Sequence, residues 1–411
     1  MERLETALRE ELARFGDLKK ILIVPPDISR LSSFAGPITC KLFEMFSGID
    51  VDIMPALGTH IPMTSDEINR MYPGVPQNCF LVHDWRKDVT KIGEVPRDVV
   101  FKLSEGAIDE PIDIEINKRL LDPSYDAVIS LGQVVPHEVV GMASYSKNLF
   151  VGCGGFSMLN KTHYLGALYG MERMMGRDRS PVREVLDYAE RQMKIPLLHV
   201  LTVTSGVGEH ETRLEGAFID RERGGFEKAV ELSRKKNVFF LDEELDKVVC
   251  YLDPRKIKTT WIGNKAIYRT RMAIADGGEL TVIGPGVFRF GEDLNNDRII
   301  RKHGYRGRDK TLAAMRGENG RELRENLSVA AHLIHGSSDG RFKITYATDE
   351  MTKEEIESVG FNFIETREAL QKYDIANIKN GWNETNGERF FYVSNPAMGL
   401  WANRKRFYEQ S

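Results

Sequence analysis

Short apolar runs that alternate with amphipathic stretches constrain this chain more than any other feature. In the first half, four such runs contain many β-branched residues and are only six to eight residues long, which is typical of buried strands: 20–25, 51–58, 125–132 and 197–203. Helical periodicity separates them at 38–48, 65–72 and 180–194. Strands that alternate with helices predict βαβ units and a mainly parallel sheet, and hence an α/β fold.

A second series of strand-like runs follows, at 278–286, 341–348, 361–370 and 389–396, with helical stretches at 292–335 and 352–358. The region 252–266 between the two series is polar and has little periodicity, so it is the predicted boundary. We therefore expect two α/β domains with mainly parallel sheets, with the active site in the cleft between them. The first, catalytic and cofactor-binding, spans 1–260 and the second 265–390, and the pattern leaves the packing of the tail 391–411 open.

Charge and apolar content exclude several classes of protein. The chain has 57 Lys and Arg against 61 Asp and Glu, a net charge of −4, so no basic excess indicates nucleic acid. No apolar run approaches the roughly 20 residues of a membrane-spanning helix, and the charged N-terminal stretch does not resemble a secretory signal. The four cysteines show no CxxC spacing. We expect a cytoplasmic protein with no membrane partner.

Charged and titratable side chains follow three successive predicted strands. Asp27 and Arg30 come after the first strand, His60 after the second and His137 after the third. In open parallel sheets, ligands bind beyond the carboxyl ends of the strands, so these side chains are candidates for one site. Further along the chain, a polar and glycine-rich run at 144–155 carries Lys147, and His163 follows it.

Each of these side chains also has a purely structural interpretation. Asp27 can cap a helix by accepting backbone N–H bonds. His60 can be a satisfied histidine in a Gly-Thr-His turn, and Lys147 taken alone is an ordinary surface lysine. Their grouping at one edge favours a functional role, because a fold rarely needs so many titratable groups at one rim.

The series PPDISR, ALGTHIP and VVPH, followed by a lysine and a histidine, resembles the nickel-pincer lactate racemase family. That family has an Asp and an Arg three residues apart and then a Gly-Thr-His motif, which here ends at His60. It also has a histidine, a lysine ten residues later and a histidine sixteen residues after that. His137, Lys147 and His163 match this spacing without a gap.

The resemblance implies an isomerase, a racemase or epimerase of a 2-hydroxy acid. Its cofactor would be the nickel-pincer nucleotide, a pyridinium-3-thioamide-5-thiocarboxylic acid mononucleotide, attached to Lys147, with His163 as a nickel ligand. His60 and His137 would be the two acid/base residues, because mirror-image substrates place their hydroxyls differently and each hydroxyl needs its own base. The implied partners are the small 2-hydroxy acid and the enzymes that build the cofactor.

Arg30 is the expected clamp for the substrate carboxylate, because a guanidinium binds a carboxylate through two hydrogen bonds. Asp27 would orient Arg30 or a histidine. The second domain departs from the family's Tyr-Gln-x-x-Lys motif, since Tyr268 is followed by Arg269 and Met272 stands where the family has lysine. Tyr268 and Arg269 are the expected substrate contacts, and the additional arginine favours a more acidic or more polar 2-hydroxy acid than lactate.

Two other functions stay open. The same histidines could bind Zn²⁺ or Mn²⁺ directly in an isomerase or hydrolase. A non-enzymatic protein could instead close two domains on a small acid through Arg30 and Arg269. The sequence does not define the oligomeric state.

Overall fold

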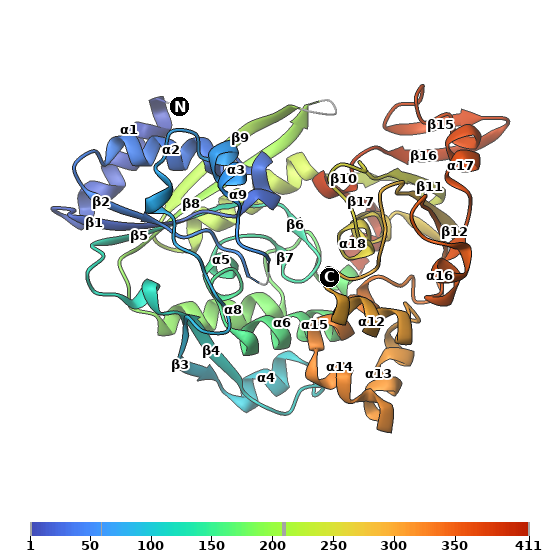
Figure 1. Cartoon of the computed structure of the whole chain (residues 1–411), viewed down its shortest axis with the longest axis horizontal. Coiled ribbons are helices and arrows are strands. Elements are labelled where there is room, and N and C mark those ends of the chain that lie inside the picture. Colours follow the sequence, from blue (N-terminus) through green and yellow to red (C-terminus); the bar gives the residue numbers. More distant parts are fainter. Residues whose placement is uncertain (1, 59, 208–210, 410–411) are drawn as a thin grey trace. The chain divides into compact units, whose positions relative to one another are not determined.

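The chain folds into two compact α/β units (Figure 1), and the computed structural model describes residues 2–58, 60–207 and 211–409. Unit 1 comprises 1–165 and 175–237, and unit 2 comprises 166–174 and 238–411. The sequence places the boundary within 252–266, whereas the units divide after Asn237. The cause is that β10 (Val238–Leu241) and β11 (Leu245–Tyr251) form sheets with later strands of unit 2.

Unit 1 contains a five-stranded sheet in the order β2-β1-β5-β8-β9. The four strands predicted in the first half are confirmed as β1 (Lys20–Val24), β2 (Asp50–Ile53), β5 (Ala127–Gln133) and β8 (Leu197–Val207), all mutually parallel. The edge strand β9 (Glu211–Asp220) is antiparallel to β8 and is not among the predicted strands. Because β1 lies between β2 and β5, the strand order reverses beside β1, where open α/β sheets bind ligands.

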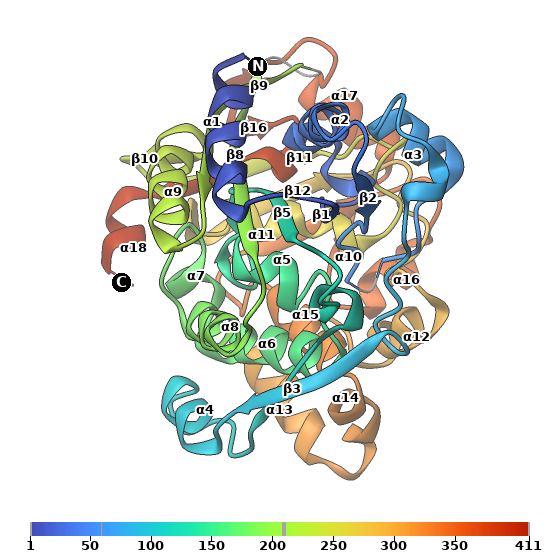
Figure 2. The same cartoon turned by 90° about the vertical axis from the view of Figure 1, so that its left-hand side faces the viewer.

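Helices cover both faces of this sheet (Figure 2). Ile21 and Ile23 of β1 pack with α1 (Glu2–Leu12) and α2 (Ala35–Met45) in one fully buried cluster. Leu201 and Val203 of β8 pack on the other face against α9 (Arg223–Asn237), and α5 (Ser146–Phe150) and α8 (Pro181–Gln192) pack together. The remaining elements are η1 (Ala13–Phe15), η2 (Ile28–Ser33), α3 (Ser65–Met71), η3 (Gln77–Cys79), β3 (Val89–Val95), α4 (Arg97–Leu103), β4 (Ile112–Asn117), η4 (Lys118–Leu121), β6 (Pro136–His137), β7 (Gly141–Met142) and α6 (Phe156–Tyr169), whose last residues enter unit 2.

Unit 2 contains a six-stranded sheet in the order β14-β13-β12-β11-β16-β15. Its strands are β12 (Ile274–Ile283), β13 (Lys343–Ala347), β14 (Asn362–Phe363), β15 (Gly381–Thr385) and β16 (Glu388–Val393) with β11, and all pairs are parallel except β15 with β16. The predicted strand 361–370 is wrong after Phe363, because α17 (Thr366–Tyr373) begins there. Thr366, Ala369 and Tyr373 are buried at helical spacing.

The helical stretches predicted in unit 2 are confirmed as α12 (Leu294–His303), α13 (Arg308–Arg316), η5 (Glu318–Gly320), α14 (Arg321–Glu325), α15 (Leu327–His335) and α16 (Lys353–Ser358). Two short helices precede them, α10 (Thr260–Gly263) and α11 (Lys265–Thr270). The tail is folded: after η6 (Pro396–Met398), β17 (Leu400–Asn403) pairs in parallel with β10, and α18 (Arg404–Glu409) follows. Among the described residues, no helix has the length and apolar character that crossing a membrane requires.

A short segment from the first half of the chain belongs to unit 2. It contains α7 (Met171–Met174), and Glu172 Oε1 accepts hydrogen bonds from Arg271 Nε at 2.8 Å and from Arg341 Nη1 at 2.7 Å. Gly170 and Gly176 flank α7 with φ values of 105° and 81°. Glu172 thus ties this segment to two arginines that are far away in sequence.

Candidate active site

Asp27 and His60 form a hydrogen-bonded pair beyond the ends of β1 and β2. Asp27 precedes η2, and its Oδ1 accepts a hydrogen bond from Ser29 N at 3.2 Å, so it does cap a helix. Its Oδ2 accepts a hydrogen bond from His60 Nδ1 at 2.6 Å. Burial by itself raises the pKa of Asp27, but the bonds from His60 and Ser29 and the charge of Arg30 outweigh it. The pKa of this carboxyl therefore lies below its usual value.

This contact determines which nitrogen of His60 carries the proton. An ionised carboxylate only accepts hydrogen bonds, so the proton lies on Nδ1 and Nε2 keeps its lone pair. The His60 side chain is 56% exposed, so the ring is accessible from solvent. Gly58 allows the turn, because its φ of 57° is in the left-handed region that favours glycine, while Thr59 lies outside the described residues.

Arg30 lies three residues after Asp27 and contacts the end of β5. Its Nη1 donates to Gln133 Oε1 at 3.5 Å, and Gln133 Nε2 donates to Thr204 Oγ1 at 2.5 Å. Burial lowers the pKa of the Arg30 guanidinium, and the carboxylates of Glu138 and Asp27 oppose that effect. A guanidinium stays protonated at neutral pH, so Arg30 supplies a fixed cation at this edge of the sheet.

His137 differs from His60 in its protonation. It is buried in the β6–β7 hairpin, and its Nδ1 accepts a hydrogen bond from Val139 N at 3.1 Å. That bond requires an unprotonated Nδ1, so the neutral ring carries its proton on Nε2. The two histidines therefore differ in tautomer: Nε2 is the acceptor nitrogen in His60 and the donor nitrogen in His137.

Lys147 is half-buried in α5, and its amine is perturbed. Burial is the largest cause that lowers the pKa of Lys147 to about 8, and the charges of Arg30 and Arg183 act in the same direction while Glu138 and Asp27 oppose them. A neutral amine is a nucleophile, whereas an ordinary lysine is almost fully protonated near pH 8. The lowered pKa therefore increases the neutral, nucleophilic fraction of the Lys147 amine near neutral pH.

Asn148 fixes the backbone next to this amine. Its Nδ2 donates to Val24 O, Ser130 Oγ and Leu131 O at 3.0–3.1 Å. These acceptors belong to the two central strands β1 and β5. The helix that carries Lys147 is thus anchored to two interior strands of the sheet.

His163 is half-buried on α6 and has the protonation state of a metal ligand. Its Nδ1 donates to Leu159 O at 2.5 Å, which leaves the lone pair on Nε2. Burial lowers the pKa of His163 to about 4. The Leu159 carbonyl opposes this shift and the charge of Lys147 adds to it. The ring is therefore neutral at pH 7, as metal coordination requires.

Glu138 is a further candidate for the site that the sequence reasoning missed. Its charge raises the pKa of Arg30, Lys147 and His163, so its carboxylate is within electrostatic reach of all three groups. The signal that could have found it is its position, because it directly follows His137 in the loop after a buried strand.

Tyr268 and Arg269 are both buried on α11 in unit 2, whereas the other six predicted site residues lie in unit 1. The Tyr268 hydroxyl is 2.9 Å from Nδ1 of His332, whose Nε2 is 2.9 Å from the Tyr305 hydroxyl. Their contact with a substrate stays a prediction, as does the cleft between two domains.

Residues 5–176 match the family model described as the lactate racemase N-terminal domain. That stretch includes Asp27, His60, His137, Lys147 and His163. The chain has a lactate racemase N-terminal domain. The family resemblance inferred from the sequence is thereby confirmed over this N-terminal stretch, and it supports a function of the racemase or epimerase type.

Two solved structures share the fold of this lactate racemase-like chain. A Thermotoga maritima protein is 22% identical with a TM-score of 0.78, over 96% of this chain and 98% of that one. The lactate racemase apoprotein from Thermoanaerobacterium thermosaccharolyticum is 17% identical with a TM-score of 0.67, over 95% of this chain and 89% of that one. At these identities the likeness shows the α/β fold, which confirms the predicted class. No curated protein matches the sequence.

Proposed function

We propose that this lactate racemase-like chain is a racemase or epimerase of 2-hydroxy acids that carries a nickel-pincer nucleotide on Lys147. The strongest support is that Lys147 and His163 both have lowered pKa values and interact electrostatically. Lys147, with a pKa of about 8, is a nucleophile, and the charge of Lys147 acts on His163, a neutral imidazole. One group can hold a cofactor covalently while the other coordinates its metal.

Both side chains fit the group that the family implies. A metal-bound imidazole commonly donates its second ring N–H to a backbone carbonyl, as His163 does to Leu159 O. Imidazole together with soft sulfur is a suitable ligand set for nickel. When bound, the group would supply an acceptor for the hydride of the substrate's carbon 2.

The Asp27–His60 pair is suited to removing the hydroxyl proton. Nε2 of His60 accepts that proton, and the Asp27 carboxylate stabilises the imidazolium that forms. His137 donates a hydrogen bond from Nε2, which suits a substrate oxygen while that oxygen carries negative charge. For His137 to act as the second base, its proton must first move to Nδ1, and the bond from Val139 must break.

Arginine side chains with a fixed positive charge are suited to binding the substrate's acidic groups. Arg30 is the proposed partner of the substrate carboxylate, because its guanidinium offers two parallel N–H donors. Arg269, where the family has glutamine, would favour an additional acidic or polar group. Replacing Arg269→Gln should shift preference toward small monocarboxylates such as lactate, and an unchanged substrate profile would remove this part of the proposal.

The two other functions have less support. A Zn²⁺ or Mn²⁺ enzyme needs three or more protein ligands, and within residues 2–58, 60–207 and 211–409 no three His, Cys, Asp or Glu side chains are grouped in that way. A protein that only binds a small acid gives no reason for the Asp27–His60 pair or for the perturbed Lys147.

Intact mass tests the proposal directly. The protein is made together with the enzymes that build the cofactor, and we expect an added mass, mapped by peptide analysis to Lys147, with bound nickel. Lys147→Arg should remove the added mass, and Lys161→Arg on the neighbouring helix α6 should keep it. Wild-type protein that stays unmodified after this co-production contradicts the proposal.

Isotope exchange tests the reaction separately. Single enantiomers of 2-hydroxy acids are turned over in deuterated water. If the hydride is returned internally, carbon 2 keeps its protium, and incorporation of deuterium would indicate proton abstraction from carbon instead.

A further inference from the structure

The backbone immediately before Lys147 is strained. Ser144 and Tyr145 have φ values of 70° and 60°, in the left-handed region that residues other than glycine rarely adopt. Two consecutive residues of this kind persist only where the surroundings enforce them. The contacts of segment 142–146 show which side chain does so.

Arg183 of α8 is fully buried and donates hydrogen bonds into this segment from both ends of its guanidinium. Its Nη1 donates to Ser144 O at 3.2 Å and to Ser146 Oγ at 2.7 Å. Its Nη2 donates to Met142 O at 2.6 Å and to Ser144 O at 3.2 Å. The planar fork thus spans three acceptors that end one residue before Lys147, which a compact ammonium group cannot do.

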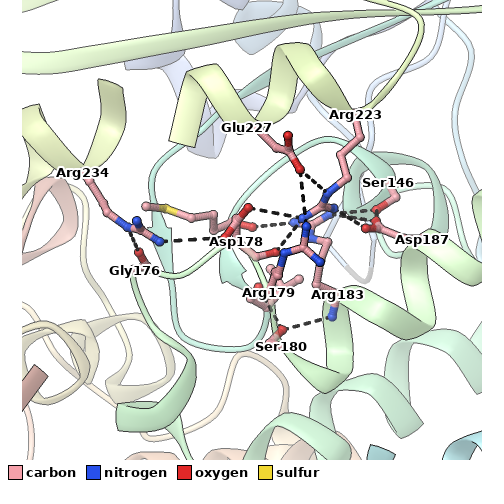
Figure 3. Close-up of polar contacts among 12 residues, drawn as sticks. Ser146, Gly176, Asp178, Arg179, Ser180, Arg183, Asp187, Arg223, Glu227 and Arg234 are labelled. Carbon is pink, nitrogen blue, oxygen red and sulfur yellow. Dashed lines mark hydrogen bonds and ion pairs between the residues drawn. The ribbon is translucent and has the colours of Figure 1, made fainter. Parts of the chain in front are cut away.

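Ion pairs among Asp187, Arg223 and Asp178 hold the Arg183 side chain in this position (Figure 3). Asp187, one turn further along α8, accepts a hydrogen bond from Ser146 Oγ at 2.6 Å and lies 3.9 Å from Arg183 Nη1. Asp187 also pairs with Arg223 of α9, which contacts Asp178 at 3.4 Å. A buried guanidinium is costly unless it is paired and hydrogen-bonded, so this network keeps Arg183 charged and in place.

We infer that Arg183 is the positioning residue for Lys147, because it shapes segment 142–146 and so holds the lysine amine where the cofactor is to be attached. The significance of that position rests on the proposed function, but the contacts themselves do not. Asn148 directly follows Lys147 and is hydrogen-bonded to β1 and β5. Arg183 is hydrogen-bonded to the residues before Lys147, so the attachment point is held on both sides.

The test measures the amine itself in the full-length apoprotein. Trace labelling with acetic anhydride over a range of pH gives the titration midpoint of Lys147, with exposed Lys228 as the internal reference. The charged and titratable groups that act on Lys147 are Asp27 at the start of η2, Arg30 within η2, Glu138 after β6, His163 on α6 and Arg183 on α8. We expect a wild-type midpoint near 8.

Arg183→Lys keeps the positive charge but cannot make all the hydrogen bonds of the guanidinium. Segment 142–146 should therefore leave its strained conformation, and Lys147 should become more exposed. Its midpoint should then rise by about one pH unit, a tenfold change in the protonation equilibrium. Arg191→Lys, an exposed position on the same helix, should leave the midpoint unchanged. A folded Arg183→Lys protein with the wild-type midpoint, or an equal rise in Arg191→Lys, overturns the inference.

Ser146→Ala keeps the test decisive if Arg183→Lys does not fold. It removes one acceptor of Arg183 and the bond to Asp187 without changing any charge, and it should also raise the midpoint. An unchanged midpoint in folded Ser146→Ala overturns the inference. Cofactor attachment is read separately by intact mass, so a positioned Lys147 that never gains the cofactor would contradict the proposed function and leave the positioning role intact.

Discussion

The Nδ1 atom of His60 lies 2.6 Å from the Oδ2 atom of Asp27, a residue 33 positions earlier in the chain. The contact links the loops after two neighbouring parallel strands. It leaves Nε2 of His60 as a proton acceptor at a largely exposed position, and it leaves the carboxylate buried.

Asp27→Asn should lower the turnover number on the substrate by roughly 100-fold or more, because the imidazolium loses its counter-ion and the ring loses its preferred tautomer. The rate is measured by chiral chromatography after incubation with one enantiomer. Asp50→Asn, an exposed carboxylate on β2, is the matched control and should leave the rate within about twofold. Equal rates in both variants would contradict a catalytic role for the pair.

His163 should make stability fall as the solution is acidified. Its folded pKa of about 4 lies below its unfolded value of 6.5, so between these values the unfolded state binds more protons than the folded state. From about pH 7 to about pH 5, the wild type should lose about 2 kcal/mol relative to His163→Gln. Urea unfolding of both proteins at the two pH values measures this. Parallel losses in the two proteins would show that His163 is not held neutral.

Gly132→Ala should destabilise the protein by about 1 to 3 kcal/mol through overpacking. A Cβ atom at this position in β5 would lie 1.7 Å from Ser144 Oγ, so the strained segment before Lys147 must shift. Gly206→Ala in β8 is the matched control, since a Cβ there meets nothing within 4 Å. Denaturant unfolding compares the two, and similar losses would contradict the close packing of Ser144 on β5.

His137 should carry its proton on Nε2 in the resting protein. Nitrogen-15 NMR of protein labelled at its histidines distinguishes the tautomers, and His137→Gln assigns the signal. We expect a protonated Nε2 and an unprotonated Nδ1 at neutral pH, because Val139 N–H donates to Nδ1. Finding the proton on Nδ1 instead would make His137 equivalent to His60 and restore two interchangeable bases.

The rule for parallel strands is sufficient to predict that Asp27 and His60 come together, because the period and length of the apolar runs define the strands and their carboxyl ends. The same rule groups His137 with them, which stays a prediction. It could not find Glu138, whose importance depends on Arg30 and Lys147, two residues carried by other segments of unit 1. Nor could it find Arg183, which in sequence is an ordinary helical arginine and becomes special only through the backbone carbonyls around it.

The fold errors have a similar origin. The run 361–370 begins as a strand and continues as α17, and a window that spans both cannot separate period 2 from period 3.6. The polar stretch 252–266 predicts the domain boundary, whereas Val238 and its neighbours already pair with β17 at Leu400–Asn403. Pairing over such a separation has no local signature.

The contacts of Glu172 with Arg271 and Arg341 have a consequence for how this protein can be divided. Unit 2 consists of two separate stretches of the chain, so residues 238–411 expressed or exchanged alone would deprive both arginines of the carboxylate they share. A separately produced unit 2 therefore needs residues 166–174 as well.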